Sequence, residues 1–156
     1  APTKSEAQHA SEERGGWSIM IVDPQAMLMG YLRVHLSCEV VAQVPSKRPD
    51  SFVLVERTGG RYTRFADYPD FAVQAWGLSK AEASALAQTV AKLIDDWPAA
   101  VSAVAEASVE SIYDFTDPDS RSPRFQLTAH AVLFATEAPS SESDLPDWDL
   151  TGWDHL

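Results

Sequence analysis

The sequence predicts an α+β fold in which a mainly antiparallel sheet of about four to five strands packs against two helices. Three stretches, residues 52–57, 71–76 and 125–134, carry the period-two pattern of apolar residues that is typical of strands. Two others, residues 23–37 and 79–94, repeat apolar residues at helical spacing. Segments rich in Gly, Pro, Asp and Ser separate these stretches, so neighbouring strands are expected to run antiparallel.

The first helix is predicted to begin at Asp23 and to end near Ser37. Aspartate is a favoured N-cap residue, and Pro24 suits the first turn because an N–H would have no helical partner there. A short apolar run at residues 40–44 follows and is closed by a proline. We expect this run to form a first strand, which turns into the strand at 52–57 and runs antiparallel to it.

Residues 52–57 are apolar on both faces until charge appears near the end of the stretch, so this strand should be buried for most of its length. The pair Gly59-Gly60 is interpreted as a tight or bulged turn between two extended segments, because glycine reaches positive φ. Its surroundings match neither a phosphate-binding loop nor a dinucleotide fingerprint. A basic and aromatic excursion at residues 61–70 is expected to lead into the strand at 71–76.

A capping box predicts the start of the second helix. The hydroxyl of Ser79 and the carboxylate of Glu82 have the spacing that satisfies free backbone donors in the first turn. An apolar stripe then continues along the helix, and the Trp-Pro pair at residues 97–98 is expected to end it or to bend the chain. Residues 99–107 show no clear pattern, and we expect a connector there.

The last two strands are predicted to form a hairpin. Residues 109–115 and 125–134 have strand patterns, and a loop rich in turn residues at 116–120 separates them. One face of the last strand is expected to be apolar, with Phe125, Leu127, Ala129, Ala131 and Leu133.

Length and composition predict one globular domain with extra segments at both ends. A chain of 156 residues is the usual size of one domain, and 45% apolar residues suffice for a core. We expect a flexible N-terminal arm at residues 1–18, a domain at 19–136 and an acidic tail at 137–156. The arm lacks the apolar centre of a secretory signal, and no stretch has the roughly twenty apolar residues of a membrane span. A soluble, intracellular product without membrane contact is therefore expected.

The net charge of -11 argues against sequence-specific nucleic-acid binding, which needs clustered Lys and Arg. The tail contributes six acidic residues and no Lys or Arg, together with Trp148 and Trp153. Two interpretations of the tail stay open. It is a solubilising segment without fixed structure, or its tryptophans dock on a neighbouring protein.

No group of residues predicts catalysis, a metal site or a cofactor. The histidines have no second ligand at metal-binding spacing; they are His9, His35, His130 and His155. The single cysteine, Cys38, is expected to be a buried, inert thiol, because no orienting third group accompanies it for nucleophilic catalysis. The acidic residues Asp114, Asp117 and Asp119 are expected to set turns in the loop rather than to bind a cation.

Several motifs occur in a fixed order along the chain. After the first helix and the short strand come Arg48-Pro49, the sequence FVLVERTGG at residues 52–60, Asp67-Tyr68-Pro69, and FAVQAWG at 71–77. The capped helix at 81–94 and the passage DPDSRSPRF at 117–125 complete the order. This arrangement resembles the tail terminator proteins of long-tailed, siphovirus-type actinobacterial phages. The resemblance covers residues 22–135.

The resemblance implies a small α+β subunit of the virion tail or neck, present in the host cytoplasm during assembly. Such subunits form a hexameric ring that caps the tail tube and joins it to the head-side connector. The implied partners are therefore further copies of the chain, the tail tube protein and the connector or stopper protein. The family implies no catalytic residues, so the chain is not expected to be an enzyme.

Three alternatives remain at this point. A head–tail connector or completion protein of the neck belongs to the same class of structural proteins. A small partner-binding module would act through the tryptophans of the tail. A small enzyme would use His35, Cys38 or the acidic cluster at residues 114–119.

The segment around the glycine pair is expected to contact neighbouring subunits or the tail tube. Its arginines would meet acidic patches, and its aromatic residues would act as apolar anchors. A head-to-tail contact repeated around an axis would also cover an exposed edge or face of the sheet. The predicted interface residues are Arg48, Arg57, Gly59, Gly60, Arg61, Tyr62, Arg64 and Phe65.

Overall fold

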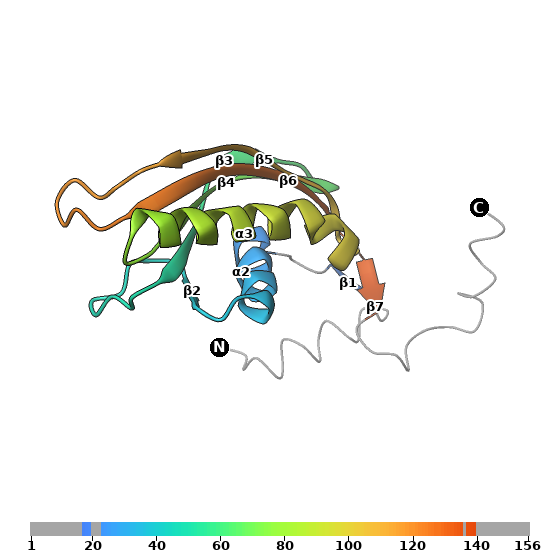
Figure 1. Ribbon diagram of the computed structural model, residues 1–156. Coiled ribbons are helices and arrows are strands. Elements are labelled where there is room, and N and C mark those ends of the chain that lie inside the picture. Colours follow the sequence, from blue (N-terminus) through green and yellow to red (C-terminus); the bar gives the residue numbers. More distant parts are fainter. Residues whose placement is uncertain (1–16, 20–22, 136, 140–156) are drawn as a thin grey trace. The chain divides into compact units, whose positions relative to one another are not determined.

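The computed structural model describes residues 17–19, 23–135 and 137–139 (Figure 1). They belong to two units, which are taken separately below. In the smaller unit, strand β1 (Trp17–Ile19) pairs antiparallel with β7 (Glu137–Pro139). The rest of the expected N-terminal arm and of the acidic tail, including Trp148 and Trp153, lies outside the described residues.

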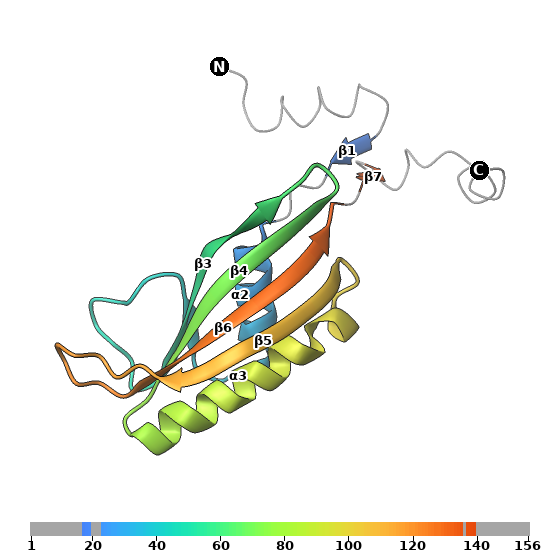
Figure 2. The same cartoon turned by 90° about the horizontal axis from the view of Figure 1, so that it is seen from above.

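The larger unit is an α+β domain, as predicted. Its five-stranded sheet has the order β2-β3-β4-β6-β5, and two helices lie on one face of it (Figures 1 and 2). The elements are α2 (Pro24–His35), β2 (Glu39–Val41), β3 (Phe52–Tyr62), β4 (Ala66–Trp76), α3 (Lys80–Ala100), β5 (Val104–Asp114) and β6 (Arg124–Phe134). Among the described helices, none combines the length and the hydropathy that a membrane span requires.

The core lies between the sheet and the two helices. It consists of the apolar stripes that the helices turn toward the sheet, and of alternate strand residues on the facing side. Its most buried members include Leu28, Leu32, Val53, Val55, Val73, Val90, Ile94, Trp97, Leu127 and Leu133. The predicted apolar face of the last strand is confirmed, with only Phe125 partly exposed.

Strand β3 is buried on both faces over its first half, as its sequence pattern predicts. On the side away from the core, the ring of Phe52 stacks on that of Trp76 with 5.0 Å between centroids. The two residues are direct partners in the antiparallel β3–β4 register. This stacked pair shields one end of the sheet face that the helices do not cover.

The predicted helix starts are confirmed. Asp23 Oδ1 accepts hydrogen bonds from the backbone N–H of Gln25 at 3.0 Å and of Ala26 at 3.4 Å. Ser79 Oγ accepts from the N–H of Glu82 at 3.1 Å. The carboxylate of Glu82 reaches back to the N–H of Leu78 at 3.2 Å. These bonds satisfy donors that have no partner within the helix.

The direction predicted for the first strand is wrong. Strand β2 runs parallel to β3, with Glu39 opposite Phe52 and Val41 opposite Leu54. The connection at residues 42–51 carries the chain back to the end of the sheet where β2 began, so both strands start from the same end. Two prolines and a series of polar residues make this segment an irregular crossover instead of a tight turn.

The tight or bulged turn predicted at Gly59-Gly60 is a bulge within a strand, and the chain does not reverse there. Strand β3 continues to Tyr62, and the β3–β4 register shifts between Arg57 and Gly59, which marks a β-bulge. Gly60 has φ 103° within it, a conformation suited to glycine. The glycines therefore allow the strand to bend rather than to end.

The chain reverses three residues later, at Thr63. Its N–H donates to the carbonyl of Ala66 at 2.8 Å, and its Oγ1 accepts from the N–H of Ala66 at 3.1 Å. Strand β4 starts at Ala66, so residues 66–70, expected to lie in an excursion, are paired strand. A threonine hydroxyl that bonds the backbone can set such a turn without glycine.

The predicted end of the second helix is three residues too early. Pro98 lies inside the last turn of α3, and Val101 N–H still donates to the carbonyl of Trp97 at 3.0 Å. A proline so close to the C-terminus removes one hydrogen bond and leaves the next intact. The connector is also shorter than predicted, since β5 begins at Val104. The hairpin of β5 and β6 is antiparallel, as predicted.

Cys38 is half-buried rather than buried. It follows α2 directly before β2, where the domain surface is close, and it packs against the edge of the core. Its partial burial raises the pKa of the thiol. A raised pKa makes the thiolate scarce at neutral pH, in line with an unreactive group.

Candidate protein-interaction surface

Most of the predicted interface residues gather at one end of the sheet, in the β3–β4 hairpin. We call residues 59–66 the hairpin tip. The tip projects from two paired strands, which hold it through the register Tyr62–Asp67, Arg61–Tyr68 and Gly60–Pro69. A tip carried by paired strands presents its side chains in a defined arrangement.

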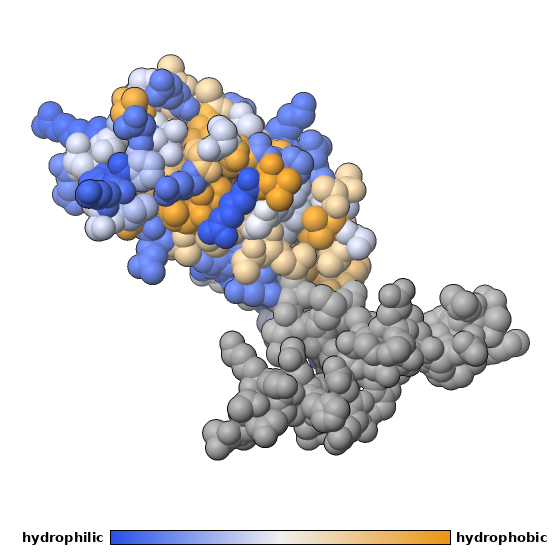
Figure 3. Space-filling model, turned by 90° about the horizontal axis from the view of Figure 1, so that it is seen from below, coloured by the Kyte–Doolittle hydropathy of each residue, from blue (hydrophilic) through white to orange (hydrophobic). Residues whose placement is uncertain are grey.

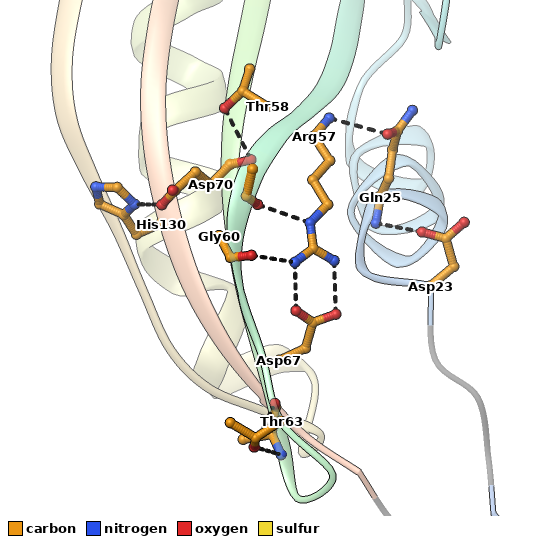
Figure 4. Close-up of polar contacts among 11 residues, drawn as sticks. Asp23, Gln25, Arg57, Thr58, Gly60, Thr63, Asp67, Asp70 and His130 are labelled. Atoms are coloured by element: carbon orange, nitrogen blue, oxygen red, sulfur yellow. Dashed lines mark hydrogen bonds and ion pairs between the residues drawn. The ribbon is translucent and has the colours of Figure 1, made fainter.

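Arg57 anchors this hairpin from within. Its guanidinium binds the carboxylate of Asp67 in a two-pronged contact, with Nη1 to Oδ2 at 2.8 Å and Nη2 to Oδ1 at 2.6 Å. Nε donates to the carbonyl of Gly59 at 2.9 Å (Figure 4). The Arg57 side chain is 27% exposed and that of Asp67 is 12% exposed. The hydrogen bond to Asp67 raises the pKa of Arg57. The structure thus gives Arg57 a role in shaping the bulge.

Gln25 completes the outer edge of β3 beside this arginine. Its side-chain amide oxygen accepts from the N–H of Arg57 at 3.1 Å (Figure 4). Its amide nitrogen donates to the carbonyl of Val55 at 3.2 Å. The Gln25 amide thus bonds one backbone carbonyl and one backbone N–H at the edge of β3, as a neighbouring strand would. Sequence reasoning missed this contact, because nothing in the local pattern connects a helix start with a strand thirty residues later.

The tip exposes two aromatic side chains. Tyr62 is 73% exposed and Phe65 is 76% exposed. The guanidinium of Arg61 lies 4.4 Å from the ring centroid of Tyr68, and that of Arg64 lies 5.9 Å from the ring of Phe65. Exposed aromatics with adjacent arginines match the composition of energetic hot spots at protein interfaces.

Phe134 adds a third exposed aromatic residue to the same end of the sheet. It is 52% exposed and pairs with Ala66, the first residue of β4. The sequence pattern placed Phe134 at the end of the last strand, yet it gave no sign that this end adjoins the tip. The exposed set is therefore Tyr62, Phe65 and Phe134.

Arg48, the remaining predicted interface residue, lies away from the hairpin tip. Its guanidinium lies 5.3 Å from the ring of Trp76 and donates to Ser120 Oγ at 3.1 Å and Ser122 Oγ at 3.3 Å. Trp76 is at the opposite end of β4 from the tip. An eleven-residue strand spans roughly 33 Å, so Arg48 and the tip cannot form one contact point. Arg48 ties the crossover to the β5–β6 loop.

Two of the three acidic residues at the β5–β6 loop, Asp114 and Asp117, bond nearby backbone N–H groups, as predicted for residues that set turns. Asp114 Oδ1 accepts from the N–H of Thr116 at 3.0 Å, and its Oδ2 pairs with Lys80 Nζ at 3.0 Å. Hydrogen bonds from Thr116 and Lys80 lower the pKa of Asp114 to about 2. Asp117 accepts from the N–H and the hydroxyl of Ser120, and the hydroxyl bond lowers the pKa of Asp117.

His130 has two acidic neighbours on the helix-free face of the sheet. Its Nδ1 contacts Asp70 Oδ1, and its Nε2 lies 2.7 Å from Glu110 Oε1. The two ring nitrogens point in opposite directions, so one metal ion could not meet both carboxylates through them. No group of three potential metal ligands with suitable geometry occurs among residues 17–19, 23–135 and 137–139.

The two faces of the domain differ in character. Seen from the helix side, apolar patches lie between polar ones (Figure 3). The helix-free face carries a polar ladder instead, in which Gln74 Oε1 accepts from Trp76 Nε1 at 3.2 Å and Gln74 Nε2 donates to Gln126 Oε1 at 3.1 Å. Ser111 and Thr128 share a further hydrogen bond across β5 and β6.

Comparison with known proteins leaves the family open. No protein-family model matches the chain, and no curated protein matches its sequence. The resemblance to tail terminators thus stays a prediction.

Proposed function

We propose that the chain is a tail terminator subunit of a long-tailed phage. In this role, copies of the chain form a ring that caps the tail tube and joins it to the head-side connector. The observation that carries the proposal is the hairpin tip, where Tyr62 and Phe65 are exposed on a hairpin that the Arg57–Asp67 pair holds in shape. The tip acts by shape and surface complementarity, without turnover of a substrate.

The composition of the tip supports contact with a protein partner. The exposed rings of Tyr62 and Phe65 are hydrated at a free-energy cost, and burial against a partner would remove that cost. Arg61 and Arg64 lie next to these rings, so the matching surface would carry acidic groups around an apolar centre. The proposed partners are the tail tube protein or the head-side connector.

The sheet edges support association between copies. Strand β5 forms one border of the sheet, and β2 covers only three residues of β3 at the other. Open edges invite pairing with another chain. When one edge of each copy binds a different edge of the next copy, the copies form a closed ring if the rotation between neighbours divides a full turn evenly. We propose a ring of six copies.

Deleting the gene from the phage that encodes it tests the function. Loss of a terminator should give filled heads with abnormally long, unjoined tails in electron micrographs. Normal tails with leaking heads would instead identify a connector or completion protein. Normal particles would reject both, and would leave a partner-binding module acting through the acidic tail.

A further inference from the structure

The two borders of the sheet have opposite charge. Strand β5 carries Glu106, Glu110 and Asp114, and no Lys or Arg. The segment at residues 57–64 carries Arg57, Arg61 and Arg64, and no acidic residue. Each border exposes backbone to solvent over several residues, and their charges are complementary. Two copies of the same chain could therefore meet through these different borders.

The strand directions permit such a meeting without disturbing the sheet. Each of the pairs β3–β4, β4–β6 and β6–β5 is antiparallel, so β5 runs opposite to β3. When β5 of one copy lies beside β3 of the next, the pair is antiparallel and the alternation continues. Neither β2 nor Gln25 bonds the part of β3 from Thr58 to Tyr62. Within this part, the Arg57 guanidinium bonds the carbonyls of Gly59 and Gly60.

The cross-strand register aligns the opposite charges. Arg61 on β3 pairs with Tyr68 on β4. Asp67, the residue before Tyr68, pairs with Leu133 on β6. Leu133 is next to Val132, which pairs with Glu106. Arg61 and Glu106 therefore lie at the same height along the strands, at opposite borders. Both side chains belong to the helix-free side of the sheet. Leu133 faces the core, so its neighbour Val132 and the partner of Val132, Glu106, face away from the helices. Arg61 lies on the same side, because its guanidinium covers the ring of Tyr68, which is in the same row.

We infer that β5 of one copy pairs edge to edge with residues 58–62 of β3 in the next copy, and that Glu106 then meets Arg61. This inference deepens the proposed function and rests on its ring-forming part. It names a second copy of this chain as the partner.

The opposing explanation is protection of the edge. Strand β5 has two register shifts against β6, and bulges and charged residues commonly blunt free edges. Protection requires only that β5 repels other strands. It does not require basic residues at the same height on the other border. The pairing of Glu106 with Arg61 separates the two explanations.

Charge reversal in the full-length chain tests this pairing. Arg61→Glu and Glu106→Arg, each alone, should raise the concentration needed for association by about fivefold, the scale of a surface ion pair turned to repulsion. The double variant should associate like the wild type. Sedimentation velocity over a concentration series measures this. Lys47→Glu, an exposed residue of the crossover outside both β3 and β5, is the control and should have no effect.

Cysteine cross-linking tests the same contact even when association is transient. The row Gly59–Asp70–His130–Ser108 is continuous in the register, so Gly59 and Ser108 mark its two ends. A Cβ at Gly59 meets no atom within 4 Å, so Gly59→Cys should be accommodated. Combined with Ser108→Cys and Cys38→Ser in one chain, it should give disulfide-linked oligomers, because paired strands bring such residues within disulfide reach.

A matched chain with Ser46→Cys in place of Gly59→Cys is the control for random collision. Cross-linking no greater than in this control, or a double charge variant that fails to recover, overturns the edge pairing. The tail-length experiment still decides the proposed function on its own. Oligomers that form regardless of Arg61 and Glu106 would retain the ring and reject this interface.

Discussion

Glu110 Oε1 lies 2.7 Å from His130 Nε2, which links the outermost strand β5 to β6. The other ring nitrogen of His130 contacts Asp70 on β4. A neutral imidazole has one N–H and can donate only once, so both contacts are satisfied only when the ring is protonated. Protonated His130 therefore fastens three neighbouring strands on the helix-free face.

This arrangement predicts a pH dependence of stability. Burial lowers the pKa of His130, but the hydrogen bonds to Glu110 and Asp70 outweigh it, and the pKa is raised above its usual value. A group with a raised pKa in the folded state stabilises the protein below the unfolded pKa, of about 6.5 for histidine. That contribution should be lost as the pH rises through the raised value.

Urea unfolding of the wild type and of His130→Gln at several pH values measures this effect. The difference in free energy of unfolding should be largest at mildly acidic pH, below the unfolded pKa of histidine, and should shrink toward alkaline pH. His35→Gln, a change in the other histidine of the domain, is the control. A difference that stays constant across this range would contradict the protonated bridge.

Arg57→Ala should destabilise the domain. The substitution leaves the carboxylate of Asp67, which is only 12% exposed, without its two-pronged partner. The expected loss in free energy of unfolding is about 2 kcal/mol, typical of a charged hydrogen-bonding group left unpaired. Denaturant titration provides the value. Arg61→Ala, which removes only a contact of an exposed side chain with the face of the Tyr68 ring, should change stability by less than about 0.5 kcal/mol.

Gly60→Ala should also destabilise the hairpin, because the backbone there has φ 103° and an added Cβ would lie 2.0 Å from the carbonyl oxygen of Tyr68. Relief of that clash requires the bulge to move, at a cost of at least about 2 kcal/mol. Thermal unfolding tests this against Gly59→Ala, where a Cβ has open space. Equal effects at both glycines would show that the bulge is not under this constraint.

Tyr62→Ser and Phe65→Ser should leave the fold intact and impair assembly. Both rings are mostly exposed, so the free energy of unfolding should change by less than about 0.5 kcal/mol. In a phage complementation assay, the double variant should give long or unjoined tails. Tyr113→Ser, at a partly exposed ring outside the tip, should complement normally. Normal tails from the double variant would remove the tip from the proposed contact with the tube or connector.

Features that depend on neighbouring residues in the chain could be predicted. The starts of both helices follow from Asp23 and Ser79, whose side chains bond backbone groups two or three positions away. The antiparallel β5–β6 hairpin follows from two apolar patterns on either side of a loop whose aspartates bond nearby N–H groups. These interactions act within a few residues, so the local pattern contains the information that determines them.

Features that depend on distant residues became visible only in the folded domain. The parallel direction of β2 results from the path of residues 42–51, and periodicity carries no sign of strand direction. The bulge before Gly60 depends on the pairing of Arg57 with Asp67, ten residues further on. His130 meets Asp70 and Glu110 because the register aligns three strands. Local propensity determined which segments become helices and strands, whereas packing and register determined which side chains meet.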